Sequence, residues 1–149
     1  MRVVVQKCIE SSVSVDGKII SSIGKGLMVL VGFTHDDSVN DIDYLVNKVV
    51  NLRIFEDEKG VMNKSLLDIS GEILCISQFT LYGNTDKGNR PSYIDAMGGD
   101  KATILYDKFC DKLNDKVPTK KGVFGADMKV SLINDGPTTI IINSKKMEK

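Results

Sequence analysis

Hydrophobic residues occupy alternate positions at the start of the chain. The residues that follow this alternation, which Lys7 and Ser11 interrupt, are Val3, Val5, Ile9, Val13 and Val15. A period of two predicts one long half-buried strand or two short ones. Asp16-Gly17 then predicts a hairpin turn, because both residues tolerate positive φ. Residues 27–33 are nearly all apolar, which predicts a central strand covered on both faces.

Two later segments change to helical spacing. In the first, Ser38 and Asp41 have the spacing of a capping box. The apolar positions that follow are Ile42, Leu45, Val46 and Val49. The second helix is predicted between a capping Asp100 and a stop at Pro118. Its apolar stripe consists of Ala102, Leu105, Tyr106, Phe109 and Leu113. Both patterns predict amphipathic helices whose apolar faces belong to the core.

The remaining segments are mostly strand-like. Residues 73–82 form one apolar run, and residues 128–132 alternate. Residues 134–137 predict a hairpin turn before a strand at 138–142. Strands with two helices and no internal repeat predict an α/β protein with a single domain over residues 1–149. We expect a layered or barrel-like, mostly antiparallel sheet with two main helices on one side.

Composition limits the partners of the protein. The 149 residues are 42% hydrophobic and 27% charged, which is typical of a globular domain. Twenty basic and twenty acidic side chains give zero net charge, so no long-range attraction to nucleic acid is expected. The basic concentrations are Lys120-Lys121 and a tail with Lys145, Lys146 and Lys149. Such clusters are usually solvated surface. Without an apolar run of about 18 residues or a signal-peptide layout, we expect a cytoplasmic protein that does not bind membranes.

Several common chemistries are excluded by the residues that the sequence lacks. Cys8, Cys75 and Cys110 lie far apart in apolar segments, which predicts core thiols in a reducing compartment. His35 is the only histidine, and it precedes a predicted helix start rather than a candidate nucleophile. A histidine-rich zinc site is therefore impossible, and a Ser-His-Asp or Cys-His site is disfavoured. No phosphate-binding loop motif occurs. We expect no metal and no cofactor.

Three segments break the regular pattern. One face of the run at 73–82 begins apolar and ends in Gln78 and Thr80, which fits either a strand that lines a cavity or one that simply reaches water. Residues 83–99 form a long loop without periodicity, and such loops are usually functional or disordered. In the predicted turn at 134–137, Pro137 lacks an N–H and restricts Gly136. The pattern alone does not decide whether their peptide bond is cis.

Two of these segments together carry a family resemblance. Ser77-Gln78-Phe79-Thr80-Leu81 and Asn134-Asp135-Gly136-Pro137-Thr138 resemble the paired signatures of the D-aminoacyl-tRNA deacylases. The resemblance covers the whole chain. Its other segments are residues 1–6, 51–55, 62–66, 88–92 and 124–128. One departure is Lys7, where the family often has arginine, which puts in doubt any bidentate contact at that position.

The resemblance implies a homodimeric hydrolase that acts at the aminoacylated 3′ end of transfer RNA. It would cleave the ester between a D-amino acid and the terminal adenosine, and would remove glycine mischarged onto alanine tRNA. The active site would lie at the dimer interface. A cis Gly136-Pro137 peptide would enter the partner's pocket, where its carbonyl groups would exclude an L side chain.

The same resemblance assigns roles to two further groups of residues. Ser77, Gln78, Phe79 and Thr80 would line the ester pocket, with main-chain N–H groups around Phe79 and Thr80 as oxyanion donors. Thr80 is also a candidate nucleophile, but no neighbour would lower its pKa, so we expect it to orient water. The residues implied to bind the adenine and flank the pocket are Phe124, Gly125, Ala126 and Met128. Apart from the resemblance, we expect Lys120, Lys121 and the lysine tail to touch the acceptor stem.

Two other functions stay open. The fold could be reused as a non-catalytic nucleic-acid-associated or dimerisation module. The intact Gln78, Thr80, Gly136 and Pro137 argue against this alternative. The second is an ordinary esterase that uses Thr80 or Cys75 as its nucleophile. That alternative predicts small esters as good substrates and a sharp loss of activity in Thr80→Val or Cys75→Ala.

Overall fold

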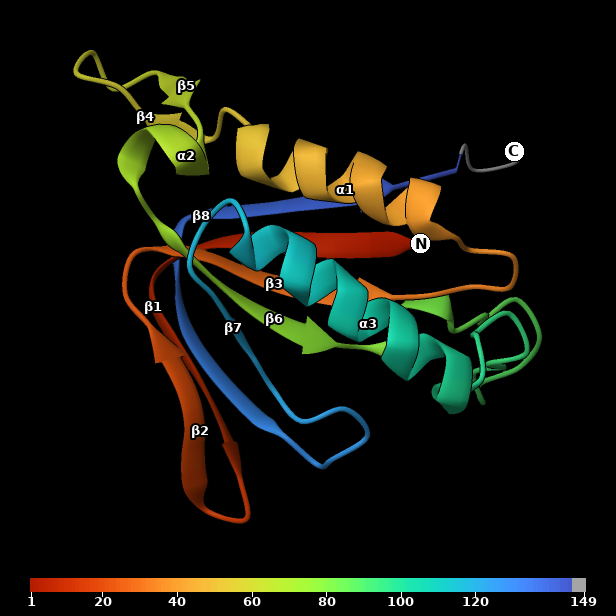
Figure 1. Ribbon diagram of the computed structural model, residues 1–149. Coiled ribbons are helices and arrows are strands. Elements are labelled where there is room, and N and C mark those ends of the chain that lie inside the picture. Colours follow the sequence, from red (N-terminus) through yellow and green to blue (C-terminus); the bar gives the residue numbers. More distant parts are fainter. Residues whose placement is uncertain (146–149) are drawn as a thin grey trace.

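A computed structural model describes residues 1–145 of the chain (Figure 1). Lys146 and Lys149 of the predicted basic tail lie outside the described residues. The elements in chain order are β1 (Arg2–Val15), β2 (Lys18–Ile23), β3 (Gly26–Gly32), α1 (Val39–Asn51), β4 (Phe55–Glu56), β5 (Met62–Lys64), α2 (Leu66–Ile69), β6 (Glu72–Ser77), the 3₁₀ helix η1 (Phe79–Tyr82), α3 (Gly99–Asn114), β7 (Thr119–Lys121) and β8 (Lys129–Asn143). No helix within these residues is long and apolar enough to cross a membrane.

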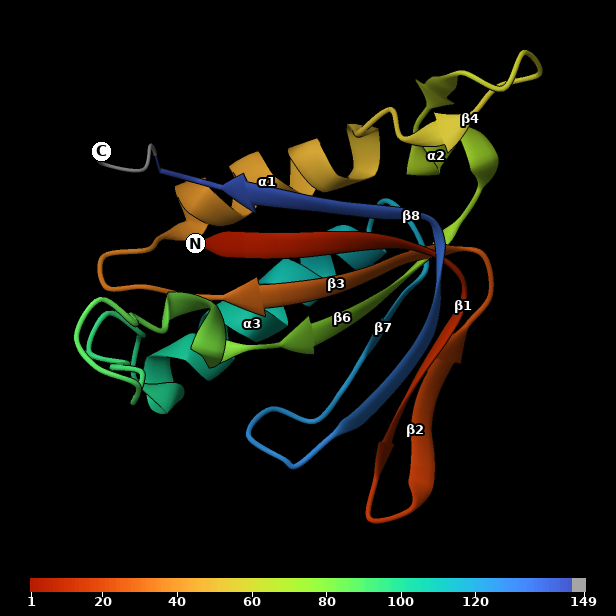
Figure 2. The ribbon, with the colours of Figure 1, turned by 180° about the vertical axis from the view of Figure 1, so that it is seen from behind.

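The main sheet is organised around the long strand β1. Residues 2–8 of β1 pair with β3, residues 11–15 pair with β2, and β8 follows both halves, always antiparallel. Strands β3, β6 and β7 add a parallel section. Figures 1 and 2 show that β1 and β8 bend together, so that the sheet folds over on itself.

Side chains bring the two ends of the sheet together. The Ser21 hydroxyl donates to the Lys121 carbonyl at 2.7 Å, and the Lys120 ammonium donates to the Ser22 carbonyl at the same distance. Strands β2 and β7 are thereby joined without a ladder of backbone bonds. The sheet is a nearly closed, barrel-like structure, which confirms the predicted fold class.

The segment at residues 134–137 is not the hairpin turn that its Gly and Pro predict. Gln6 pairs with Thr139 and Cys8 pairs with Asn134, so only Lys7 lies opposite the four residues from Asp135 to Thr138. A hairpin would reverse the chain, but β8 continues along the same partner strand after this bulge. The Asn134 side-chain oxygen accepts from the Thr138 N–H at 3.0 Å, which replaces one missing ladder bond.

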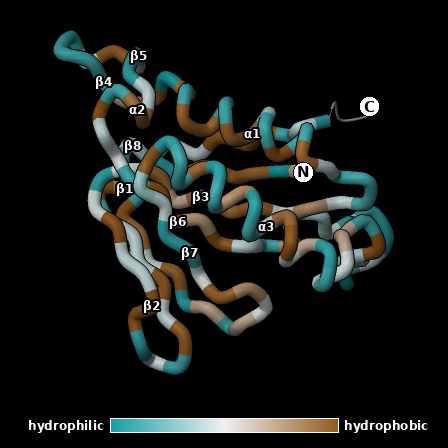
Figure 3. The backbone as a smooth tube through the Cα atoms, viewed as in Figure 1, coloured by the Kyte–Doolittle hydropathy of each residue, from teal (hydrophilic) through white to brown (hydrophobic). Residues whose placement is uncertain are grey.

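Helices α1 and α3 cover one face of the sheet (Figure 1), as predicted. Their sequences alternate between hydrophobic and hydrophilic residues in Figure 3, and the hydrophobic positions that face the sheet, such as Leu45 and Phe109, are fully buried. The predicted capping box of Ser38 and Asp41 is present. The predicted cap of α3 is wrong: Gly98 takes the extended cap conformation, and Asp100 lies in the first turn. A carboxylate there still favours the helix dipole.

A second, smaller core fills the space inside the folded sheet. Its fully or nearly buried members are Cys8, Val13, Ile23, Met28, Leu74 and Ile76. All three cysteines are buried and free, as the sequence predicts. The sheet is therefore packed on both faces over much of its area, which explains the nearly continuous apolar sequence of β3.

Candidate active site

A cavity of about 560 Å³ opens where β3 and β6 end. These strands are parallel, and Val31 pairs with Ser77, so their carboxyl ends meet at one edge of the sheet. The cavity is also lined by parts of segment 93–102 and by residues 124–128. Ligands commonly bind at such an edge.

The run at residues 73–82 does not continue as a strand to Tyr82, as its apolar sequence predicts. The Gln78 N–H donates to the Val31 carbonyl at 2.7 Å, and the chain then turns into η1. Gly32 permits this turn, because a Cβ there would lie only 2.8 Å from the Gln78 carbonyl oxygen. The Leu81 N–H donates to that same oxygen at 3.3 Å. In a 3₁₀ helix, the N–H groups of the preceding residues, Phe79 and Thr80, have no partner within the helix.

The predicted ester-pocket residues lie together at this turn. Ser77, Gln78 and Phe79 line the cavity, whereas Thr80 lies exposed beside it. The Gln78 amide donates to the Thr80 hydroxyl. Within residues 1–145, no histidine or carboxylate forms a hydrogen bond with that hydroxyl. The arrangement therefore offers backbone donors and one amide, without a base beside Thr80.

The predicted adenine-binding segment forms the opposite wall. Residues 123–126 make a tight turn in which the Ala126 N–H donates to the Val123 carbonyl at 3.2 Å and Gly125 has φ +78°. Phe124, Gly125, Ala126 and Met128 all line the cavity. The Phe124 ring packs against Tyr106, with ring centroids 5.8 Å apart. This packing connects the turn to the buried side of α3.

Arg2 is a feature of the site that sequence reasoning missed. Its Nη1 donates to the Leu81 carbonyl at 2.5 Å, and its Nε donates to the Asn143 side-chain oxygen at 2.7 Å. The guanidinium carbon lies 4.8 Å from the centre of the Tyr82 ring. Arg2 therefore ties the end of η1 to two strands. The sequence holds no signal for this contact, because Leu81 is 79 positions away.

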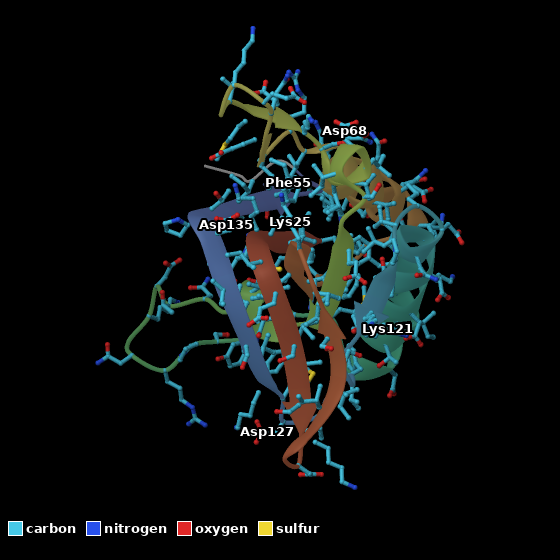
Figure 4. The ribbon with its side chains drawn as sticks, turned by 90° about the vertical axis from the view of Figure 1, so that its left-hand side faces the viewer. Lys25, Phe55, Asp68, Lys121, Asp127 and Asp135 are labelled. Atoms are coloured by element: carbon cyan, nitrogen blue, oxygen red, sulfur yellow. The ribbon has the colours of Figure 1, made fainter. Side chains whose placement is uncertain are left out.

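Gly136 and Pro137 do not line this cavity. They lie in the β8 bulge opposite Lys7, which pairs with Leu27 near the start of β3, whereas the cavity lies at the end of β3. Gly32 is five positions after Leu27 along the strand, which is a distance of roughly 17 Å. Figure 4 shows the same separation: Asp135 lies at the bend of β8, and Asp127 lies at the far end of that strand.

The bulge itself has a distinctive backbone. The peptide bond between Gly136 and Pro137 is cis, and Gly136 has φ +121°. Both residues are exposed, whereas the neighbouring Thr138 side chain is buried. A Cβ on Gly136 would lie 2.6 Å from the Thr138 hydroxyl oxygen, so glycine is required here. Lys7 is buried, and its ammonium lies 3.4 Å from the Ile54 carbonyl, with no hydrogen bond to the described residues of the bulge.

Comparison with known proteins identifies the family. Residues 4–143 match the sequence model of the family described as D-Tyr-tRNA(Tyr) deacylase. The chain belongs to this deacylase family. Among its relatives are D-aminoacyl-tRNA deacylases of Clostridium botulinum, 58% identical over 98% of this chain and 99% of the relative, and of Clostridium acetobutylicum, 55% identical over 99% of both chains. The resemblance based on the motifs is confirmed.

Solved structures agree with the fold of this deacylase. The structure of the c-Myc DNA Unwinding Element Binding Protein is 42% identical, has a TM-score of 0.93, and covers 98% of this chain and 100% of its own. A probable eukaryotic D-amino acid tRNA deacylase has a TM-score of 0.80 at 21% identity and covers 95% of this chain and 98% of its own. The second comparison supports the fold alone.

The buried thiol of Cys75 is unsuited to nucleophilic attack in this deacylase. Burial raises the pKa of Cys75 well above its ordinary value, and the residue does not line the cavity. The Tyr106 hydroxyl donates to the Cys75 carbonyl at 2.7 Å, which fixes β6 against α3. His35 Nε2 lies 2.7 Å from the Ile94 carbonyl oxygen, outside the cavity lining. The structure thus assembles neither a Cys-His nor a Ser-His-Asp site within residues 1–145.

Proposed function

We propose that this deacylase hydrolyses the ester between a D-amino acid and the 3′-terminal adenosine of transfer RNA, releasing both products. By the same reaction it would remove glycine mischarged onto alanine tRNA. Family membership establishes the deacylase class, and an ester hydrolase is the enzyme class that the sequence predicts. The observation that carries the proposal is the turn at Gln78, after which the Phe79 and Thr80 N–H groups, beside the cavity, have no backbone partner among residues 1–145.

The chemistry requires little from the side chains. An aminoacyl ester is already activated, so a positioned water molecule and stabilisation of the oxyanion suffice. The N–H groups of Phe79 and Thr80 would bind the oxyanion, and Gln78 would position the ester. Thr80, held by the Gln78 amide, would orient the water rather than attack, since no histidine or carboxylate among residues 1–145 bonds its hydroxyl to take the proton.

The terminal adenosine would occupy the opposite wall. The turn at 123–126 presents backbone groups and the Phe124 ring to the cavity, with Met128 at its flank. Gly122 allows Met128 to pack there, because a Cβ at residue 122 would lie 2.6 Å from the Met128 sulfur. Backbone groups can read the adenine edge by hydrogen bonds while the aromatic ring supplies a stacking surface.

Chiral selection would come from a second copy of the chain. Gly136 and Pro137 are exposed but lie far from the cavity of their own chain. In a homodimer, this protruding bulge can enter the cavity of the partner. Its carbonyl groups would then face the α-carbon of the substrate, where they leave room for hydrogen but not for an L side chain.

Contacts with the rest of the tRNA would be few. The zero net charge gives little long-range attraction, so the salt dependence of binding should be shallow. Lys120 and Lys121 could touch the acceptor stem, although Lys121 is paired with Asp107 at 2.7 Å, which raises the Lys121 pKa. Lys145 pairs with Asp37 at 3.0 Å. We place the reaction in the cytoplasm, where aminoacylated tRNA is used.

A non-catalytic nucleic-acid-binding role is the second candidate. The name of the 42% identical structure, c-Myc DNA Unwinding Element Binding Protein, favours it. Catalysis is favoured by the turn at Gln78 and by the walls of the cavity. A module that only binds nucleic acid does not need backbone donors beside a cavity.

The deciding experiment compares D-tyrosyl-tRNA with L-tyrosyl-tRNA as substrates of the purified protein, with a metal chelator present. We expect rapid release of D-tyrosine and negligible release of L-tyrosine. Ile104→Ala, on the exposed side of α3, is the matched control. Cleavage of neither ester by a folded protein would overturn the enzyme proposal and leave the binding role.

A further inference from the structure

Apolar side chains are exposed along one rim of the cavity. Phe79 is 57% exposed, Tyr93 is 40% exposed and Ile94 is 79% exposed. Phe79 and Tyr93 both line the cavity, and their rings pack edge to face with centroids 5.1 Å apart. Gly83 makes room for this pair, because a Cβ there would lie 3.1 Å from the Tyr93 ring. The apolar rim is thus continuous with the proposed ester site.

The backbone holds this rim in place. The Ile94 carbonyl oxygen lies 2.7 Å from His35 Nε2, and the Met97 N–H donates to the Phe33 carbonyl at 3.0 Å. Both partners, Phe33 and His35, belong to the loop that follows β3. The side chain of Ile94 therefore projects into water from a fixed backbone. An apolar surface that is exposed and rigid commonly marks a binding site.

The hollow surface continues beyond the cavity on this side. A second cavity of about 560 Å³ is lined by His35, Asp36 and residues 97–101, and it shares Met97 and Gly99 with the first. The exposed cations Lys87 and Arg90 belong to the same long loop, balanced by Asp86 and Asp95. This shape fits a ligand that extends out of the site, and the balanced charge leaves its binding to apolar contact rather than to phosphate groups.

We propose that Tyr93 and Ile94 form a stacking platform for the base that precedes the terminal adenosine of the tRNA. The inference rests on the proposed function, which places the terminal nucleoside in the adjoining cavity. Stacking on aromatic and apolar side chains tolerates any base. The platform therefore adds affinity for the single-stranded 3′ end without distinguishing one tRNA from another.

Fluorescence tests the platform without requiring catalysis. The sequence contains no tryptophan, so Tyr93→Trp introduces the only indole. The ligands are adenosine and the unacylated trinucleotide cytidylyl-cytidylyl-adenosine. We expect the trinucleotide to quench the emission and to bind at least about 5-fold more tightly than adenosine. Equal affinities for the two ligands would overturn the proposal, whether or not the protein is a deacylase.

Kinetics provide the second test. Ile94→Ala shortens the platform and leaves the Phe79–Tyr93 pair intact, and Ile104→Ala removes a similarly exposed isoleucine (58%) from α3. The substrates are D-tyrosyl-tRNA and D-tyrosyl-adenosine. We expect kcat/KM of Ile94→Ala to fall about 5-fold more on the tRNA than on the adenosine ester. Ile104→Ala should change the two values equally.

Two kinetic outcomes would contradict the platform. One is an equal loss on both substrates in Ile94→Ala. The other is a loss that differs between D-tyrosyl and D-alanyl esters, which would assign the rim to the amino-acid side chain. If the wild-type protein cleaves neither ester, the proposed function fails, and the fluorescence experiment still decides whether the rim binds the nucleotide.

Discussion

The Arg2 guanidinium donates to the Leu81 carbonyl oxygen at 2.5 Å and thereby links the first strand of the chain to the end of η1. The same side chain donates to Asn143 at 2.7 Å and lies over the Tyr82 ring. Three contacts from one planar group fix the position of η1. The backbone donors at Phe79 and Thr80 depend on that position.

Replacing Arg2 should therefore reduce turnover more than substrate binding. Arg2→Lys keeps the charge but loses the planar guanidinium, which donates to Leu81 and Asn143 at once. We therefore expect kcat to fall about 10-fold with little change in KM. Arg2→Gln should show the same pattern. Lys48→Gln is the matched control, since Lys48 lies over the Tyr44 ring on α1, away from the cavity. Wild-type kcat in Arg2→Lys would show that η1 is positioned without the guanidinium.

Gly32 is a second position that controls the turn at Gln78. A Cβ there would lie 2.8 Å from the Gln78 carbonyl oxygen and 3.2 Å from Leu81 Cβ. We expect Gly32→Ala to cost about 1–3 kcal/mol of unfolding free energy and to shift η1. Activity at a temperature where the variant is folded should then fall. Gly24→Ala, whose Cβ would be 3.6 Å from the Glu72 carboxylate, should change neither quantity much.

The role of Thr80 can be separated from that of a nucleophile. If Thr80 orients water, Thr80→Val should lower kcat less than about 10-fold on D-tyrosyl-tRNA, because it removes one neutral hydrogen bond worth about 1 kcal/mol. Cys75→Ala should retain activity, since the thiol is buried outside the cavity lining. A loss of several orders of magnitude in Thr80→Val, with small esters as good substrates, would support the esterase alternative instead.

Alkaline pH should destabilise the fold through its buried thiols. Burial raises the pKa of Cys8 from 9.0 to about 11. Between these values the unfolded chain releases a proton that the folded chain retains, so the unfolding free energy falls as pH rises. Urea titrations at pH 8, 9.5 and 10.5 should show this decline. The decline should be shallower in Cys8→Ala; an unchanged slope would assign it to other groups.

The parts of the fold that depend on local sequence were predictable. The capping box at Ser38 depends on hydrogen bonds between residues three positions apart. The covered strand at residues 27–33 is visible as a short, continuous apolar run. The bulge at 134–137 was not predictable as such, because a Gly-Pro pair between two strands has the same local signature as a hairpin. The segment is shown to be a bulge rather than a hairpin only by the pairing of both halves of β8 with β1.

The sequence predicts which segments contribute to the candidate site, but not the long-range contacts that hold them together. The segments at 77–80 and 124–128 converge on one cavity, as the resemblance implies. Arg2, Tyr93 and Met97 were missed, since their contacts join segments far apart in the sequence. Asp100 was wrongly chosen as a cap because an aspartate in the first turn and one at the cap differ by only two positions.

In the proposed mechanism, the Gly136-Pro137 bulge acts in the cavity of a partner chain. A mixed dimer tests it directly. One chain carries Pro137→Ala, and the other carries Ala126→Phe, which fills its cavity. The two chains are purified together through different tags, so each mixed dimer has one open cavity, in the Pro137→Ala chain.

The measurement is hydrolysis of D-tyrosyl-tRNA and L-tyrosyl-tRNA by this mixed dimer, compared with both parent proteins. The Ala126→Phe protein alone should be inactive, and the Pro137→Ala protein alone should lose activity or discrimination. We predict that the mixed dimer cleaves the D ester with wild-type discrimination, because its open cavity receives an intact bulge from the partner. Behaviour identical to that of Pro137→Ala alone would show that the bulge acts within its own chain and would contradict its insertion into the partner.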